Sequence, residues 1–219
     1  MNCLTKHLRY VFYLIVFIGY SCASAGSYDD FFQAVGRDDD AKVSQLLARG
    51  FDVNTVDPAG AHGLLLAIRA PSPKVLGVLL KARGLKVEVR NAKDESALML
   101  AALAGMREVC ERLIALDADV NKTGWTPLHY AASGGHDAVI QLLLAHYAYI
   151  DAESPNQTTP LMMAAMYGSV SSVKLLLDAG ADATLRNALG LSAQDFAQRG
   201  GRMDSFELIA ARLRRATSN

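Results

Sequence analysis

The chain has 219 residues, 51% of them hydrophobic, and its 22 basic and 22 acidic residues give a formal net charge of zero. A neutral chain without a basic run offers no electrostatic footprint for nucleic acid or for an anionic membrane surface. With only three cysteines, it is also not a secreted scaffold held together by several disulfides.

The N-terminus has the pattern of a secretory signal peptide. Lys6 and Arg9 precede nine consecutive apolar residues, Tyr10 to Ile18, and the small residues Ala23-Ser24-Ala25 follow. A membrane-spanning helix needs about 20 apolar residues, so this run is too short to remain as an anchor. We expect residues 1–25 to be removed, leaving a chain that does not contact a membrane.

Cysteines and sequons bear on the compartment. Cleavage after Ala25 leaves Cys110 as the only cysteine, so the exported chain has no internal disulfide. Two N-glycosylation sequons occur, at Asn121 and Asn156, and both fall in expected loops. This sparse usage favours a bacterial periplasm. A lipoprotein anchored at Cys22 is the alternative, although position 19 is Gly where lipoprotein leaders usually have Leu.

A repeat of about 33 residues fills the rest of the chain. Trp125-Thr126-Pro127-Leu128-His129-Tyr130-Ala131-Ala132 recurs 33 positions later as Thr158 to Ala165, and weaker copies extend in both directions. Each copy has two short apolar stretches at helical spacing, separated in most copies by a glycine. The pattern predicts six helix-turn-helix units in residues 26–219, anchored near positions 31, 64, 98, 128, 161 and 194.

Residue types within a unit predict its local structure. Thr126 is suited to cap the first helix and Pro127 to occupy its first position, where no amide hydrogen is needed. Paired alanines such as Ala131 and Ala132 allow close stacking of neighbouring units. The first and last units carry more polar residues and are expected to be caps. We expect irregular stacking over residues 58–92 and at the link from Asn121 to Thr126, which is three residues shorter than its counterparts.

The repeated Thr126-Pro127-Leu128-His129-Tyr130-Ala131-Ala132 motif resembles the ankyrin-repeat family. The resemblance covers residues 28–215 and implies an all-α solenoid whose helix-turn-helix units are joined by β-hairpin loops. It also implies a monomeric protein that binds another protein through hairpin tips and first-helix surfaces, with no cofactor. At the variable positions of that surface and beside them stand Arg69, Glu95, Leu103, Lys122, Trp125, Ser133, Met166 and Tyr167.

Trp125 is the only tryptophan and occupies a position that packing does not require to be large. Exposed Trp, Tyr and Met residues are typical of interface anchors. We therefore expect Trp125, Met166 and Tyr167 to form the centre of a protein-binding surface, flanked by Arg69, Glu95 and Lys122. An adaptor, a stabiliser of an envelope enzyme, and an inhibitor or immunity factor all fit this expectation.

No motif predicts an enzyme or a metal site: the chain contains no GxxxxGK[ST], G-x-S-x-G, H-E-x-x-H or C-x-x-C. The alternative function, an enzyme or small-ligand binder, would use His129, His136 or Cys110. Cys110, however, stands where other units have core residues, and the resemblance implies that His129 bonds to Thr126 and nearby backbone.

Overall fold

The computed structural model describes residues 26–70 and 72–216, so the expected signal peptide lies outside it. The chain divides into two compact units between Leu85 and Lys86, within the stretch where the sequence predicts irregular stacking. The first unit contains helical residues 26–36, α2 (Asp40–Ala48), α3 (Gly63–Arg69) and α4 (Pro73–Leu79). The second contains α5 (Ala97–Leu103), α6 (Arg107–Ile114), α7 (Pro127–Gly134), α8 (Asp137–Ala145), α9 (Pro160–Tyr167), α10 (Val170–Asp178), α11 (Ala193–Arg199) and α12 (Met203–Ala216).

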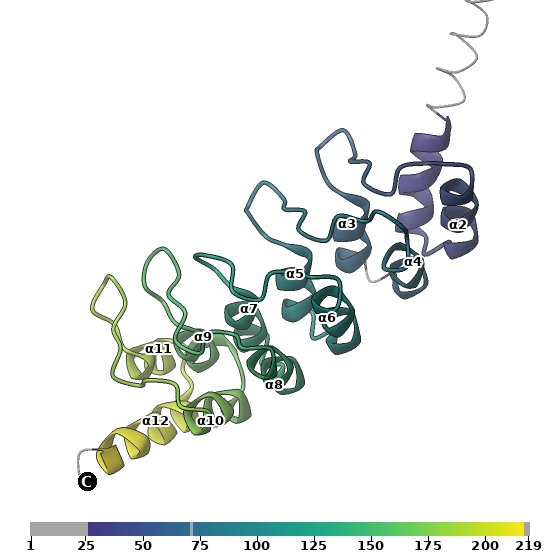
Figure 1. The fold of residues 1–219 in the computed structure, drawn as a ribbon. Coiled ribbons are helices and arrows are strands. Elements are labelled where there is room, and N and C mark those ends of the chain that lie inside the picture. The colour runs from purple at the N-terminus through teal and green to yellow at the C-terminus, as the bar shows by residue number, and fades with distance from the viewer. Residues whose placement is uncertain (1–25, 71, 217–219) are drawn as a thin grey trace, which may run out of the picture. The chain divides into compact units, whose positions relative to one another are not determined.

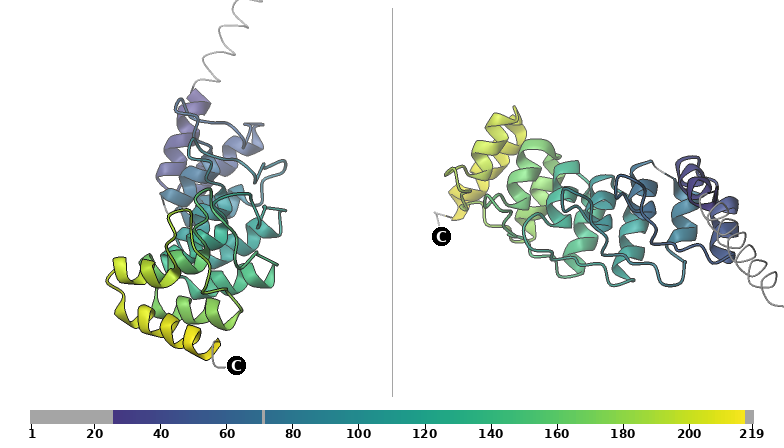
Figure 2. Two further views of the ribbon diagram at one scale, coloured as in Figure 1. Left: turned by 90° about the vertical axis from the view of Figure 1, so that its left-hand side faces the viewer. Right: turned by 90° about the horizontal axis from the view of Figure 1, so that it is seen from above.

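The described residues form α-helices and no β-strand, which confirms the predicted all-α class. The protruding hairpins contain isolated bridges instead, pairing Val56 with His62, Arg90 with Ser96 and Arg186 with Ser192. Within the second unit the first helices α5, α7, α9 and α11 pack in one row, and the second helices α6, α8, α10 and α12 pack in another (Figure 1, Figure 2). The two rows are the layers that bury the apolar faces of the repeats.

The first unit is built in the same way around a larger aromatic side chain. Phe31 is fully buried, with its ring 4.8 Å from that of Phe51. A Cβ atom added to Gly63 would lie 2.7 Å from the Phe31 ring, so the start of α3 lies directly against that ring. The second helices α2 and α4 pack side by side, and α3 pairs with α4.

The first helices carry the caps that the sequence predicts. Thr126 and Thr159 are N-caps whose hydroxyls accept the backbone N–H three residues later, and Pro127 and Pro160 follow them. Ser96 and Ser192 cap α5 and α11 in the same way. Each cap satisfies an N–H group that the helix itself leaves without a partner.

The hairpins share one turn geometry. An Asn or Asp oxygen closes three of them by accepting the N–H groups of the residues two and four positions later; these residues are Asp57, Asn91 and Asn187. Four positions before the anchor that follows each hairpin the backbone has a positive φ, at Gly60, Asp94, Gly124, Gln157 and Gly190. The shorter hairpin before α7 keeps this last feature, with φ of 82° at Gly124, so α7 is still presented like its neighbours.

Small residues let the first helices of the second unit approach closely. Ala131, Ala132, Ala164 and Ala165 are fully buried. A Cβ atom added to Gly168, at the end of α9, would lie 2.9 Å from the Ala164 carbonyl oxygen and closer still to that of Ala132. Nothing larger than hydrogen therefore fits at position 168 without moving backbone.

Replacing Gly168 tests this packing. Its φ of −79° is accessible to alanine, so Gly168→Ala should act through the backbone collision alone, lowering the free energy of unfolding by about 1–3 kcal/mol. Gly77→Ala in α4 is the matched control, because a Cβ there meets nothing within 4 Å, and it should raise stability by roughly 0.5–1 kcal/mol. Urea denaturation followed by circular dichroism measures both; a neutral Gly168→Ala would contradict the close approach.

Candidate protein-binding surface

A pocket of about 240 Å³ opens on the first-helix side of the second unit. Its walls come from α5, from the hairpin before α7, and from the first helices α7 and α9. The lining residues are Leu103, Trp125, His129, Tyr130, Ser133 and Met163. Three of the eight surface residues expected from the sequence, Leu103, Trp125 and Ser133, thus line one hollow.

Trp125 is half-buried and forms one wall of the pocket. Its ring meets the His129 ring edge-on, with the ring centroids 5.2 Å apart and the planes at 75°. Leu103, on α5, is 43% exposed. A rigid aromatic ring beside an exposed leucine in a shallow hollow is the kind of site into which a partner side chain inserts.

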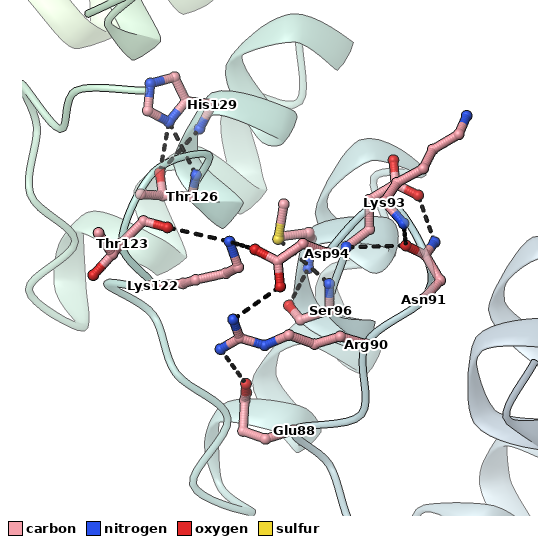
Figure 3. Close-up of polar contacts among 12 residues, drawn as sticks. Glu88, Arg90, Asn91, Lys93, Asp94, Ser96, Lys122, Thr123, Thr126 and His129 are labelled. Carbon is pink, nitrogen blue, oxygen red and sulfur yellow. Dashed lines mark hydrogen bonds and ion pairs between the residues drawn. The ribbon is translucent and has the colours of Figure 1, made fainter. Parts of the chain in front are cut away.

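His129 holds this wall in place. Its Nδ1 accepts the Thr126 N–H at 3.1 Å (Figure 3). This puts the ring proton on Nε2, and that nitrogen donates to the Thr158 carbonyl at 2.8 Å. The bond to Thr158 joins α7 to the hairpin of the next repeat, and it gives His129 the structural role that the family resemblance implies. Burial lowers the pKa of His129 to about 4, so the ring is neutral at pH 7.

Glu95 lies at the edge of the pocket and ties α7 to the preceding hairpin. Its carboxylate accepts the Tyr130 hydroxyl at 3.1 Å and the Asn91 side-chain amide at 2.6 Å. The side chain is half-buried, and its two hydrogen bonds fix the position of a negative charge at the edge of the pocket.

Lys122 differs from the expected exposed flanking cation, because its side chain is only 5% exposed. Its ammonium pairs with Asp94 and donates to the Thr123 carbonyl at 3.1 Å (Figure 3). Arg90 contacts the same Asp94 carboxylate at 3.1 Å, and the hydrogen bonds from Lys122 and Arg90 lower the pKa of Asp94. Lys122 thus joins its shortened hairpin to the preceding one and offers little surface to a partner.

The remaining expected residues lie outside the pocket. Arg69 is exposed at the end of α3, in the first unit. Met166 is half-buried and Tyr167 is 54% exposed, both at the end of α9. The Tyr167 carbonyl accepts a hydrogen bond from Arg202 at 2.9 Å. Neither Met166 nor Tyr167 is among the pocket's lining residues, although both stand on the helix that supplies Met163.

Three lining residues, His129, Tyr130 and Met163, are not among the surface residues expected from the sequence. Tyr130 and Met163 each stand two positions after the anchor of their repeat, three before the variable positions Ser133 and Met166. Residues three apart on a helix share a face. The repeat register therefore identifies the helical face on which Tyr130 and Met163 lie, one turn before the variable positions.

The structure gives the two histidines of the catalytic alternative different partners and buries its cysteine. The Nε2 atom of His136 lies 2.9 Å from the Leu103 carbonyl oxygen, whereas His129 bonds to Thr126 and Thr158. Cys110 is fully buried in α6, and burial raises the pKa of its thiol to about 12, so it is not a thiolate at neutral pH. Within residues 26–70 and 72–216, no three His, Cys, Asp or Glu side chains gather as metal ligands would.

The Asn121 sequon has a structural use. Its side-chain nitrogen donates to the Tyr147 carbonyl at 2.8 Å, and its oxygen accepts the Tyr149 N–H at 2.8 Å. Both amide atoms thus tie one loop to the next.

None of the helices that the structure describes is long and apolar enough to span a membrane.

Acidification tests the role of His129. Its pKa is about 4 in the folded chain against an ordinary value of 6.5, so the unfolded chain binds the proton more readily. The stability that the neutral ring supports is fully present above pH 6.5 and is lost as the pH falls toward 4, a change of about 3 kcal/mol.

His129→Met is the matched variant, because Met99 and Met162 stand at the same position of neighbouring repeats and accept the cap N–H with sulfur. The free energy of unfolding of this variant should depend less on pH than that of the natural chain. Parallel curves for the two proteins between pH 7 and pH 4 would show that His129 keeps its ordinary pKa.

Comparisons with known proteins match the part of the chain that contains the repeats. A family model described as "Ankyrin repeats (3 copies)" matches residues 31–123 and 98–187. The B-cell lymphoma 3 protein homolog of Mus musculus is 30% identical over 152 residues, which cover 66% of this chain and 34% of that protein. The Caenorhabditis elegans ankyrin repeat and KH domain-containing protein mask-1 is 37% identical over 119 residues, covering 52% and 4%.

Human SH3 and multiple ankyrin repeat domains protein 2 is 32% identical over 157 residues, covering 69% of this chain and 8% of that protein. The chain thus spans about a third or less of the length of these relatives, all of which are eukaryotic. A bacterial periplasmic origin therefore stays a prediction. Because the family model covers well over half of the residues, the chain belongs to the ankyrin-repeat family.

Proposed function

We propose that this chain binds another protein through the pocket formed by Leu103, Trp125, Tyr130 and Met163. Ankyrin repeats generally mediate protein–protein interaction and are typically not catalytic, and the family gives no more than that class of function. The observation that carries the proposal is the pocket, where the only tryptophan lines a hollow instead of filling the core.

The chemistry of the pocket suggests what a partner presents. Leucine, tryptophan and methionine side chains favour an apolar or aromatic group in the hollow, where water is displaced from both surfaces. Glu95, at the edge beside Tyr130, favours a hydrogen-bond donor or a cation next to that group. An adaptor, a stabiliser and an inhibitor are all roles that such binding serves.

Trp125→Ala tests the pocket. Once a partner has been recovered on the natural chain, calorimetric titration should show at least a thirtyfold loss of affinity for the variant, or about 2 kcal/mol, as for an interface anchor. A loss below about 1 kcal/mol would remove Trp125 from the binding surface. Tyr149→Ala is the control, because it also removes an aromatic ring, 68% exposed, that does not line the pocket.

We also propose that the protein acts after export, in a periplasm. The basic segment, the apolar run of Tyr10 to Ile18 and the Ala23-Ser24-Ala25 site support cleavage after Ala25. The N-terminal residue of the protein isolated from its own cells separates the alternatives. Gly26 supports cleavage by a signal peptidase, a lipid-modified Cys22 supports a lipoprotein, and Met1 would contradict both.

A further inference from the structure

A second hollow, with a volume of about 520 Å³, lies between the second helices α2 and α4 of the first unit. We refer to it as the α2–α4 groove. Its apolar floor includes Leu47 and Val78, both half-buried. Ser44 and Gly77 face it from the two helices, and Lys74 and Lys81 line it on the α4 side. None of these residues contributes to the pocket around Trp125, which belongs to the second unit.

Gly77 lines this hollow without a side chain. It lies inside α4, where glycine destabilises a helix relative to alanine. A Cβ atom added there would meet nothing within 4 Å, and its φ is not in the left-handed region, so neither close packing nor backbone geometry requires glycine. The consequence of Gly77 that the structure shows is an open groove.

The repeat register strengthens this reading. Gly77 stands thirteen positions after its anchor, and Ser44 stands thirteen after the preceding one. The corresponding residues of the other repeats have long side chains: Glu111, Gln141, Lys174 and Glu207. The α2–α4 groove is therefore the place where the two smallest residues of this register position lie on neighbouring helices.

The charges around the groove indicate the kind of occupant. Lys74 and Lys81 are exposed on either side of Gly77: Lys74 stands three residues before it on α4, and Lys81 lies in the turn just after the end of α4. Neither lysine has an ion pair with the residues that the structure describes, whereas Lys42 in the same unit pairs with Asp30 at 2.7 Å. Asp40 is the one acidic residue in the lining. Two unpaired cations on either side of an apolar floor complement an apolar side chain flanked by carboxylates.

We propose that the α2–α4 groove is a second docking site, which binds an acidic segment of a partner protein. An apolar side chain of that segment lies over Gly77, in contact with Leu47 and Val78. Carboxylates on either side of it pair with Lys74 and Lys81. The site goes beyond the proposed binding at Trp125, because it lies on different helices. Its charged flanks are lysines, whereas the edge of the pocket around Trp125 carries Glu95.

Three short peptides test the groove: acetyl-EELEE-amide, its neutral analogue acetyl-QQLQQ-amide and its analogue without the apolar side chain, acetyl-EEGEE-amide. In NMR titrations of the ¹⁵N-labelled protein, we expect EELEE to shift the amide resonances of Ser44, Gly77 and Val78 and to saturate. The two analogues should bind at least tenfold more weakly. Equal shifts from EEGEE, or no shift of groove resonances at millimolar EELEE, would overturn the proposal.

Variants then separate the groove from other sites. Gly77→Leu fills the groove while improving helix propensity, so it should weaken EELEE binding at least tenfold without lowering stability. Lys74→Gln and Lys81→Gln should each weaken binding severalfold. Lys93→Gln, on an exposed hairpin of the second unit, is the matched charge control and should bind as the natural chain does.

Two further results would contradict the proposal. Undiminished binding of EELEE by Gly77→Leu would place the peptide outside the groove. Binding to vesicles of phosphatidylserine and phosphatidylcholine, with none to EELEE, would make the lysines a lipid-binding surface instead. Trp125→Ala should bind EELEE normally, so a failure here and a failure of the pocket around Trp125 are distinguishable.

Discussion

The close approach of neighbouring first helices is the constraint on which the second unit depends. At Gly168 the backbone of α9 meets the Ala132 carbonyl of α7 with no room for a Cβ atom. Buried alanines occupy the rest of that contact. Because each repeat can bury its apolar face only against the next, this spacing sets the position of the hairpins as well as of the helices. It brings the Thr158 carbonyl within reach of His129, and so determines where Trp125 stands.

Much of this architecture could be predicted from the sequence, because it is local and repeated. Thr126 and Pro127 identify the start of α7, and the register places Cys110 in the core. The bonds of His129 to Thr126 and nearby backbone are what the family resemblance implies. The site was less accessible to sequence reasoning. The repeat register points to Met166 on α9, whereas Met163, one helical turn earlier on the same face, lines the pocket. The choice between two residues on one helical face depends on how neighbouring helices are offset, which the repeat pattern does not contain.

Lys122 shows why a charged residue is difficult to place from sequence. It lies in the hairpin that is three residues shorter than its counterparts, and its ammonium reaches the preceding hairpin at Asp94. Asp94 itself stands at a positive φ of 59°, where three of the other four hairpins have glycine at the matching position. Only the fold shows that an aspartate there serves both the turn and the neighbouring loop.

Photochemical cross-linking tests whether a partner binds at the pocket around Trp125. Benzoylphenylalanine would be placed at Ser133, which lines the pocket, and in a second protein at Gln141, which is exposed on α8. After irradiation of the cells that make the protein, we expect a discrete cross-linked complex from position 133 and none from position 141. A complex formed from position 141 alone would contradict binding at the pocket, because it would place the partner on the row of second helices.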